Sequence, residues 1–371
     1  MPMSKPSQWV CLALNNLLTT KFKTSEVSQT LEVFFIERFR GNSLRTGSFL
    51  FLPTSFTFGH PKTKSMKKII SLTLSVVCIS FFASAQKEYK LQYSFKKGDA
   101  YEWSQTAATK QHIAGPGFDQ NIESNTNVNA TMKVTELTAT GARFEVEYTK
   151  LYTKSTQAVM DSDGDTAKNV PNKILQSMKG KKFNFTLLKN GTVESIDNIE
   201  NLWSGISSIK GIPEGQGVQM KQAMENTFGK NPFKSSLEIG MVNYPDQKIK
   251  VGITWKSKTE LVTPIPLATD NTWTLESIAE PTAVVTSDGI IATTDTTKVI
   301  SPQPGLKATT NFKGRRVTKG TINVASGWPQ SCKSYSEQKG TMLLQAGGQI
   351  PEDMQIQMEI STDSEYTIKK K

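Results

Sequence analysis

Apolar and polar residues alternate along several stretches of this chain. Three runs, 130–134, 144–148 and 354–360, place an apolar residue at every second position. A period of two puts successive side chains on opposite faces of a β-strand, so that one face is buried and the other meets water, as in antiparallel sheets. The pattern therefore predicts long antiparallel strands on both sides of the middle of the chain.

Turn residues separate several of these runs. Asn190-Gly191 lies between the apolar stretches 183–188 and 192–196, and Asp288-Gly289 lies between 284–285 and 290–291. An Asn-Gly or Asp-Gly pair between such runs favours a two-residue hairpin with a type I′ turn. We expect both hairpins, and a third that closes at Thr140-Gly141.

The middle of the chain has a helical period instead. Ile199, Trp203 and Ile206 share one face of a helix, which Asp197 would cap, with Glu200 completing a capping box. Other segments carry further helix signals: the stripe Met220, Met224 and Phe228, the cap pair Asn231-Pro232, and the segment 172–179, which ends before Gly180. We expect these stripes to pack on the sheet as core. The alternative is a movable lid over an apolar pocket.

The order of these elements is strands, a helix, a hairpin, helices and further strands. It predicts an α+β, β-rich fold: a curved antiparallel sheet or partial barrel with a central helical insertion packed against it. Helices are expected around 172–179 and 198–239, within a single domain that spans 86–371.

Residues 66–85 have the three parts of a secretory signal peptide. Lys67-Lys68 supplies the positive charge, 69–82 is an apolar run of 14 residues, and 83–85 reads Ala-Ser-Ala. The sequence therefore predicts cleavage between Ala85 and Gln86 and a periplasmic or secreted location.

The signal peptide is preceded by 65 residues. We expect that translation begins at Met66 and that 1–65 is a misassigned, disordered extension. The alternative is a real extension with 69–82 as a membrane anchor. However, 14 residues span only about 21 Å as a helix, less than the roughly 30 Å of a bilayer core. Bulky Val77 precedes Cys78, which disfavours a lipid anchor, so no membrane span is expected in the mature chain.

Removing the leader changes the charge of the protein. Residues 1–85 hold 10 basic and 3 acidic residues, so 34 basic and 30 acidic residues remain and the net charge falls from +11 to +4. This small charge does not indicate nucleic-acid binding. We expect the basic runs Arg315-Arg316 and 369–371 to be solvated. Cys332 is the one cysteine left, so no internal disulfide can form and its thiol should be buried or kept reduced.

A fixed order of turn-and-strand motifs runs through almost the whole mature chain. The motifs are Phe95-Lys96-Lys97-Gly98-Asp99-Ala100-Tyr101, the strand–turn–strand 134–148, Asp161-Ser162, Gly180-Lys181-Lys182-Phe183, Asn190-Gly191-Thr192-Val193, Tyr244-Pro245-Asp246, 250–255 and 320–328. In this order they resemble an uncharacterised family of exported β-rich proteins, with a domain of unknown function, from Bacteroidota-type bacteria. Ile253 departs from the pattern, because similar proteins tend to have Asp after the glycine. The resemblance implies a location in the cell envelope and brings no catalytic residues.

Few residues of the mature chain are suited to metal or acid–base chemistry. His112 is its one histidine, and we expect it to be exposed near a strand end. Asp161, Asp163 and Asp165 are the metal candidates, because carboxylates at alternate positions can turn towards one calcium ion. Thr166 and Asn172 stand where a calcium loop has Gly and Glu, so a polar surface turn without metal or cofactor is the favoured interpretation.

Together these observations favour a non-enzymatic binding or structural role in the cell envelope. The concave face of the sheet would hold an apolar small molecule, or the protein would bind an unknown envelope partner. The alternative is a carboxylate-based hydrolase of the cell envelope, which would place two carboxylates about 5–10 Å apart on that face.

Overall fold

The computed structural model describes residues 87–371, apart from 157, 168, 210–220, 222–223, 263–264, 303–305 and 348–349. The predictions for the extension, the signal peptide and its cleavage site at Ala85 and Gln86 lie outside the described residues, as does Met220.

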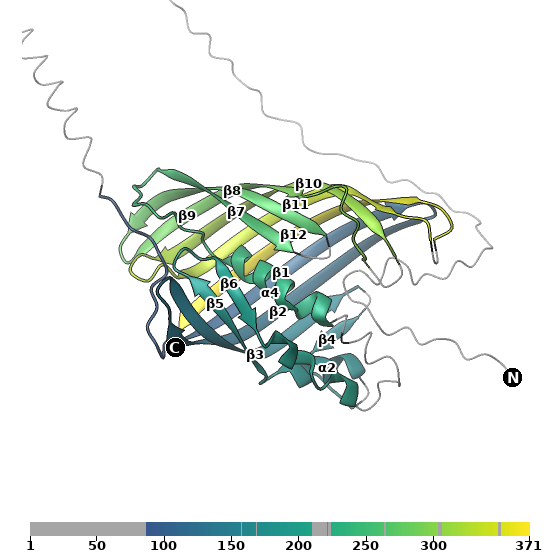
Figure 1. The fold of residues 1–371 in the computed structure, drawn as a ribbon, viewed down its shortest axis with the longest axis horizontal. Coiled ribbons are helices and arrows are strands. Elements are labelled where there is room, and N and C mark those ends of the chain that lie inside the picture. The colour runs from purple at the N-terminus through teal and green to yellow at the C-terminus, as the bar shows by residue number, and fades with distance from the viewer. Residues whose placement is uncertain are drawn as a thin grey trace, which may run out of the picture. The chain divides into compact units, whose positions relative to one another are not determined.

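The described strands form one antiparallel sheet (Figure 1). The strands are β1 (Ala100–Gly115), β2 (Phe118–Leu137), β3 (Gly141–Ser155), β4 (Val159–Asp161), β5 (Lys182–Leu188), β6 (Val193–Asp197), β7 (Thr254–Val262), β8 (Pro266–Ala279), β9 (Thr282–Thr293), β10 (Ala308–Asn323), β11 (Pro329–Leu344) and β12 (Met354–Lys370). Their order across the sheet is β6-β5-β3-β2-β1-β12-β11-β10-β9-β8-β7, with β4 paired to β3. The sheet is curved but not closed, because β6 and β7 are its two edges.

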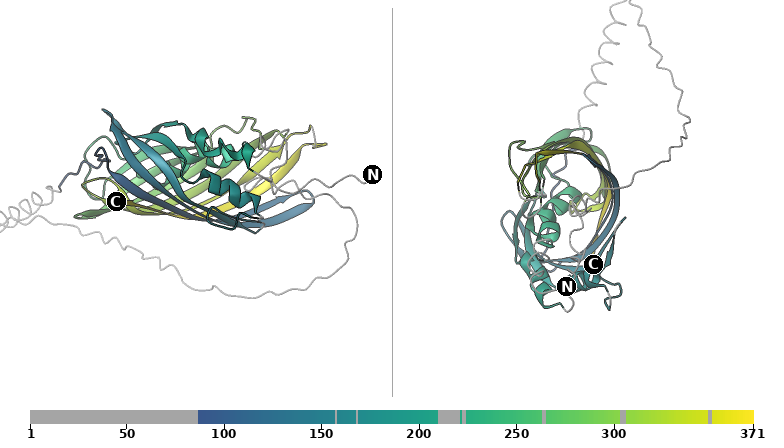
Figure 2. Two further views of the ribbon diagram at one scale, coloured as in Figure 1. Left: turned by 90° about the horizontal axis from the view of Figure 1, so that it is seen from below. Right: turned by 90° about the vertical axis from the view of Figure 1, so that its right-hand side faces the viewer.

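Short helices cover part of the inner side of this curve. They are α2 (Val170–Met178), the 3₁₀ turns η2 (Ile199–Trp203) and η3 (Ile206–Ser208), and α4 (Lys230–Gly240). Helix α4 lies inside the curve and contacts both edge strands, β6 and β7 (Figure 2). The predicted α+β, β-rich fold with a curved antiparallel sheet is therefore confirmed.

The predicted alternation is present in the strands. Met132 in β2, Val146 in β3 and Ile356 in β12 are buried, whereas the residues beside them along each strand are more exposed. The pairing register keeps these side chains on one inward face, because directly opposite residues on neighbouring antiparallel strands point the same way.

The buried apolar residues form two clusters at opposite ends of the strands. The first cluster lies where β1 begins, under α2, η2 and α4, and its centre includes Phe144 stacked on Phe185 with ring centroids 4.9 Å apart. The second cluster lies towards the other end and includes Phe312, Met342 and Met358. Between the two clusters, the inward face of the sheet is mostly polar.

Two of the three expected hairpins form. The chain turns at Thr138–Gly141, where the Thr138 amide donates to the Gly141 carbonyl at 3.0 Å. It also turns at Asn190-Gly191, but the type I′ assignment is wrong, because of these two residues only Gly191 has a positive φ, at +95°. The Gly191 amide donates to the Leu188 carbonyl at 3.0 Å, which gives a longer loop with glycine in the left-handed position.

The hairpin expected at Asp288-Gly289 is wrong. Both residues lie inside β9, where Gly289 pairs with Asn271 of β8 and Arg316 of β10. A Cβ atom on Gly289 would lie 2.4 Å from the Asn271 Oδ1 atom. The glycine is therefore explained by close packing inside a strand and not by a turn.

The helix around 172–179 is confirmed as α2, with Gly180 after it at φ +74°. The continuous helix expected from the spacing of Ile199, Trp203 and Ile206 is wrong, because η2 and η3 are separate 3₁₀ turns. Asn198 begins this segment in a left-handed conformation at φ 60°, and Asp197 ends β6 and pairs with Arg143 at 2.9 Å instead of capping a helix.

The apolar stripes nevertheless pack as core. Ile199, Trp203 and Ile206 are buried in the first cluster, and Met224 and Phe228 pack against it. The last predicted helix is α4, but it begins at Lys230 after a Gly229 cap, so Asn231-Pro232 lies inside its first turn and not at its cap.

Candidate functional site

The three candidate metal ligands do not converge. The Asp161 carboxylate accepts a hydrogen bond from the Asp163 amide at 2.9 Å, and the Asp165 carboxylate accepts one from the Ala167 amide at 2.8 Å. The Asp163 carboxylate pairs with the Lys179 ammonium, which lowers the pKa of Asp163. Throughout the described part of the chain, no three acidic, histidine or cysteine side chains are placed to share a metal ion. The segment is arranged as a polar turn.

Millimolar calcium is therefore expected to leave the melting temperature of the protein almost unchanged. A site at 100 times its dissociation constant would instead add about 2.7 kcal/mol to the free energy of unfolding. Thermal melts with and without calcium provide the measurement. A calcium-dependent rise that disappears in Asp163→Ala would contradict the turn assignment.

The surroundings of His112 and Cys332 are typical of residues with a structural role. His112 is partly exposed in β1, and its Nε2 atom lies 2.9 Å from the Asp119 carboxylate. Cys332 is completely buried on the inward face, as expected of a lone thiol, and burial raises its pKa to about 11. A thiol with this pKa is protonated at neutral pH and is a poor nucleophile.

A buried arginine lies on the inward face between the two apolar clusters. The expectation that Arg315 and Arg316 are both solvated is wrong for the second residue. Arg315 faces outward and pairs with Asp288 at 2.6 Å, but the side chain of Arg316 points inward and is only 5% exposed. The physical reason is the period of the strand, which sends neighbouring residues of β10 to opposite faces.

The hydrogen bonds of Arg316 fix its position against α4. Its Nε atom donates to the Ser334 hydroxyl at 2.7 Å, and its Nη2 atom donates to the Ile239 carbonyl in the last turn of α4 at 2.6 Å. Burial lowers the pKa of the Arg316 guanidinium, but an arginine remains protonated in proteins. A positive charge is therefore held inside the curve of the sheet.

Apart from Arg316 itself, the inward face around this residue is polar and carries no charge. Apart from Lys370 at the very end of β12, Arg316 is the single charged residue at the described inward positions of β1 and β7–β12, as the register of these strands shows. Its neighbours there are small or amide side chains, among them Ser287, Ser336, Thr318 and Asn271. Sequence reasoning missed this belt because serine and threonine in alternating runs are equally typical of a wet outer face.

Glu238 of α4 is a buried acidic residue near an edge of the sheet. Its Oε1 atom accepts a hydrogen bond from the Val193 amide at 2.9 Å and lies 4.0 Å from the Lys234 ammonium. Burial is the main influence and raises the pKa of Glu238 above its ordinary value of 4.5.

Glu238→Gln is expected to stabilise the protein at neutral pH. Because the folded pKa of Glu238 is raised, the folded state holds the proton more tightly, so this residue's contribution to stability falls as pH rises from 4.5 through the folded pKa. Glutamine keeps the acceptor for the Val193 amide without the charge. Urea unfolding at several pH values should show the gain of the variant shrinking as pH falls from the folded pKa of Glu238 towards 4.5 and staying at its minimum below that pH. An equal gain at every pH, or the same behaviour in the exposed control Glu225→Gln, would contradict the expectation.

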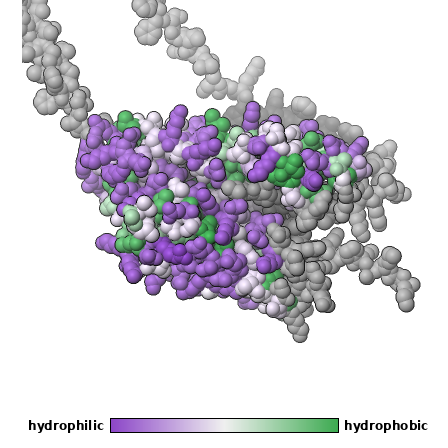
Figure 3. All heavy atoms as spheres, in the orientation of Figure 1, coloured by the Kyte–Doolittle hydropathy of each residue, from purple (hydrophilic) through white to green (hydrophobic). Residues whose placement is uncertain are grey.

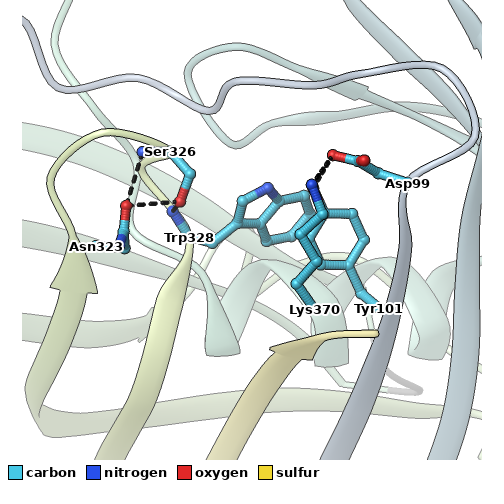
Figure 4. A network of polar contacts seen from close by, with 6 residues as sticks. All are labelled: Asp99, Tyr101, Asn323, Ser326, Trp328 and Lys370. Atoms are coloured by element: carbon cyan, nitrogen blue, oxygen red, sulfur yellow. Dashed lines mark hydrogen bonds and ion pairs between the residues drawn. The ribbon is translucent and has the colours of Figure 1, made fainter.

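A cleft of about 670 Å³ opens at the end of the sheet where β1 begins. Lys370 pairs with the Asp99 carboxylate at 2.7 Å (Figure 4), and the Tyr101 hydroxyl donates to the same carboxylate at 3.3 Å. The Tyr101 ring lies 4.6 Å from the Trp328 ring, and burial raises the pKa of Tyr101 to about 12. These contacts join the start of β1 to the end of β12 and to the β10–β11 turn, so the network holds strand ends together.

The outward face of the sheet carries a second, shallower depression of about 970 Å³ across the middle of its strands. Its exposed apolar residues, Val317 and Tyr335, stand among charged ones such as Lys319, Lys333 and Asp363. The face visible in Figure 3 is likewise mainly hydrophilic, with hydrophobic residues in small separate groups. No helix within the described ranges is both long and apolar enough to span a membrane.

Comparison with known protein families assigns the chain to one of them. A model described as a family of unknown function (DUF6263) matches residues 139–329, which is more than half of the sequence. The chain belongs to this family. The predicted membership of an uncharacterised family is thus confirmed, while the exported location and the bacterial group remain predictions. No curated protein is significantly similar to the chain.

Solved structures are similar only at a distance. A structure titled "Lipid-protein interactions in lipovitellin" is 12% identical with a TM-score of 0.41, and the match covers 74% of this chain but only 25% of that one. The outer membrane protein OprG from Pseudomonas aeruginosa is 6% identical with a TM-score of 0.20, covering 74% and 98%. An outer membrane channel from Pseudomonas putida F1 is 8% identical with a TM-score of 0.21, covering 75% and 97%. Similarity at this level carries no functional argument.

Proposed function

We propose that this protein is a non-enzymatic binding protein of the cell envelope that holds a ligand with an apolar part on the inward face of its sheet. The second apolar cluster is the observation that supports this function. The first cluster is covered by α2, η2 and α4, whereas the described helices reach the second cluster only through Ile239 of α4. Phe118, Met354 and Ile360 remain partly exposed beside it. An apolar ligand would cover these side chains and remove their surface from water.

The described inward positions favour binding over hydrolysis. A carboxylate-based hydrolase needs two acidic side chains that face each other across the substrate. The inward positions of β1 and β7–β12 in the described ranges hold no aspartate or glutamate. Between the two apolar clusters these positions hold polar amides, hydroxyls and one arginine, which suits recognition more than acid–base catalysis.

Export is the second part of this proposal. Residues 66–85 supply a charged start, an apolar run and small residues before Gln86, which is the pattern that a signal peptidase recognises. Protein recovered from the periplasm or the medium should therefore begin at Gln86. N-terminal sequencing that finds any part of 1–65 on the exported protein would contradict the proposed processing.

A pair of isoleucines provides a matched test of ligand binding. Ile360 is a half-buried inward residue beside the second cluster, and Ile290 is an outward residue that is 68% exposed. The probe is the neutral dye Nile red, whose fluorescence reports an apolar site. Ile360→Gln should weaken dye binding about tenfold, because a polar side chain replaces apolar surface at the site, while Ile290→Gln should bind like the wild type.

Thermal melts of both variants provide the control for folding. Failure of the wild-type protein to bind Nile red would overturn the proposed function. Equal loss of binding in the two variants would place the dye elsewhere and would also count against it.

A further inference from the structure

We infer that the ligand is an acidic amphiphile and that Arg316 binds its oxyanion headgroup, while its tail lies along the second apolar cluster. This inference rests on the proposed function, because it names the class of ligand for the same inward face. It is drawn from the surroundings of Arg316, from an unpaired hydroxyl beside it and from its place between a polar belt and an apolar cluster.

The charge of Arg316 has no acidic partner among the described residues. None of the ion pairs between described residues includes Arg316, and its two hydrogen-bond acceptors, the Ser334 hydroxyl and the Ile239 carbonyl, are neutral. A guanidinium has five N–H donors in a planar fork, so three of them remain for another acceptor. A buried charge without a counter-ion is unfavourable, and a bound anion would relieve that cost.

The ionisable groups that act electrostatically on Arg316 do not supply that anion. The groups whose charge would act on Arg316 are Tyr366 of β12 and Cys332 of β11, both on the inward face. Burial raises the pKa of Tyr366 to about 12 and that of Cys332 to about 11. Both groups are therefore neutral at physiological pH, and the site keeps its full positive charge.

An unpaired hydroxyl group next to Arg316 points to a ligand independently. Ser287 of β9 is 6% exposed, and its Oγ atom has no hydrogen-bond partner among the described residues. Ser287 pairs with Thr318, the next inward residue after Arg316 on β10. The hydroxyl oxygens of Thr269 and Thr310 are likewise buried without a described partner, but Thr269 is two strands away on β8 and Thr310 is about 20 Å from Arg316 along β10. Buried polar atoms rarely lack partners, and a hydroxyl beside a guanidinium would donate a hydrogen bond to a carboxylate or phosphate.

The position of Arg316 along β10 sets the direction of the tail. Phe312 of the second cluster is four residues away on the same inward face, which is about 13 Å along a strand. Met342 and Met358 lie beside Phe312 through the β10–β11 and β11–β12 pairing. A headgroup held at Arg316 would therefore place an alkyl chain against apolar side chains.

A purely structural role for Arg316 is the competing explanation. Its bond to the Ile239 carbonyl lies at the carboxyl end of α4, where a positive charge stabilises a helix. In that case, a variant would change stability and would affect all ligands alike. Discrimination between acidic and neutral ligands with the same tail separates the two explanations.

The experiment compares lauric acid, lauryl phosphate and lauryl alcohol as ligands of the mature protein, with displacement of Nile red as the readout. The wild type should bind at least one acid about tenfold more tightly than the alcohol, and comparison of the two acids identifies the preferred oxyanion. Arg316→Gln should abolish this preference and leave the affinity for the alcohol within about threefold. Arg315→Gln, the same change one residue away on the outward face, should retain the preference.

Arg316→Lys keeps the charge and should retain part of the preference, and it serves as the main variant if Arg316→Gln does not fold. Equal affinity of the wild type for acids and alcohol would overturn the inference while leaving the proposed function intact. A preference for acids that survives in a folded Arg316→Gln protein would also overturn it, as would an equal loss of all three ligands. If the wild type binds none of the three ligands and no Nile red, the proposed function itself fails.

Discussion

Trp203→Ala is expected to lower the free energy of unfolding by about 3–5 kcal/mol, the usual range for truncation of a buried aromatic side chain. Trp203 ends η2, is 3% exposed and belongs to the first apolar cluster, with Ile199 and Leu202 buried beside it. Strand β5, which contacts η2, is paired to both β3 and β6, so we expect it not to close the cavity that the indole would leave. Urea unfolding monitored by circular dichroism measures the loss.

Glu200→Ala in the same 3₁₀ turn provides the matched control, because Glu200 is exposed and its removal should change stability by no more than about 0.5 kcal/mol. Nile red binding should survive in folded Trp203→Ala, since the indole belongs to the first cluster and the proposed ligand lies at the second. Near-native stability together with lost dye binding would show that this segment is a movable lid and not core.

The long strands were predictable because their side chains alternate between a buried and a wet environment. Met132, Val146 and Ile356 follow this rule, and each lies where the alternation places it. The curvature of the sheet and the pairing of β1 with β12 were not predictable in the same way. They depend on contacts between residues about 260 positions apart, for example Gln105 with Tyr366, which no local pattern encodes.

Local signals failed where tertiary packing decided the outcome. Asp288-Gly289 has the composition of a turn, but Asn271 from the next strand fills the space above Gly289, so the strand continues. Ile199, Trp203 and Ile206 have the apolar spacing of a helix, but the segment starts after Asn198 in a left-handed conformation and breaks at Gly205 into two 3₁₀ turns. In this segment the spacing predicted burial correctly and the type of helix incorrectly.

The sequence predicted only part of the candidate site. An apolar ligand face was expected, but Arg316 was grouped with Arg315 as a solvated pair. The period of a strand could have separated them, since Arg316 shares its parity with Phe312, Gly314 and Thr318, and Arg315 does not. The absence of an acidic partner could not have been foreseen, because it depends on which strands flank β10 and on where the last turn of α4 lies.

Gly327→Ala is expected to destabilise the protein more than the same change at Gly252. Both glycines have positive φ angles, +71° at Gly327 and +85° at Gly252, so alanine at either position costs about 1–2 kcal/mol in backbone strain. At Gly252 nothing lies within 4 Å of an added Cβ atom, but at Gly327 that atom would lie 2.1 Å from the Gln92 carbonyl oxygen. We expect the clash to add roughly 1–3 kcal/mol, the usual cost of overpacking.

The difference between the two variants isolates one backbone contact. The turn that contains Gly327 accepts a hydrogen bond from the Ser94 amide at the Ser326 carbonyl, at 2.9 Å, and one from the Tyr244 hydroxyl at the Gly327 carbonyl, at 2.7 Å. A Cβ atom at Gly327 would push the segment that contains Gln92 and Ser94 away from the sheet and strain both bonds. Equal losses of unfolding free energy in Gly327→Ala and Gly252→Ala would mean that this segment moves aside without cost and that its contact with the β10–β11 turn does not stabilise the fold.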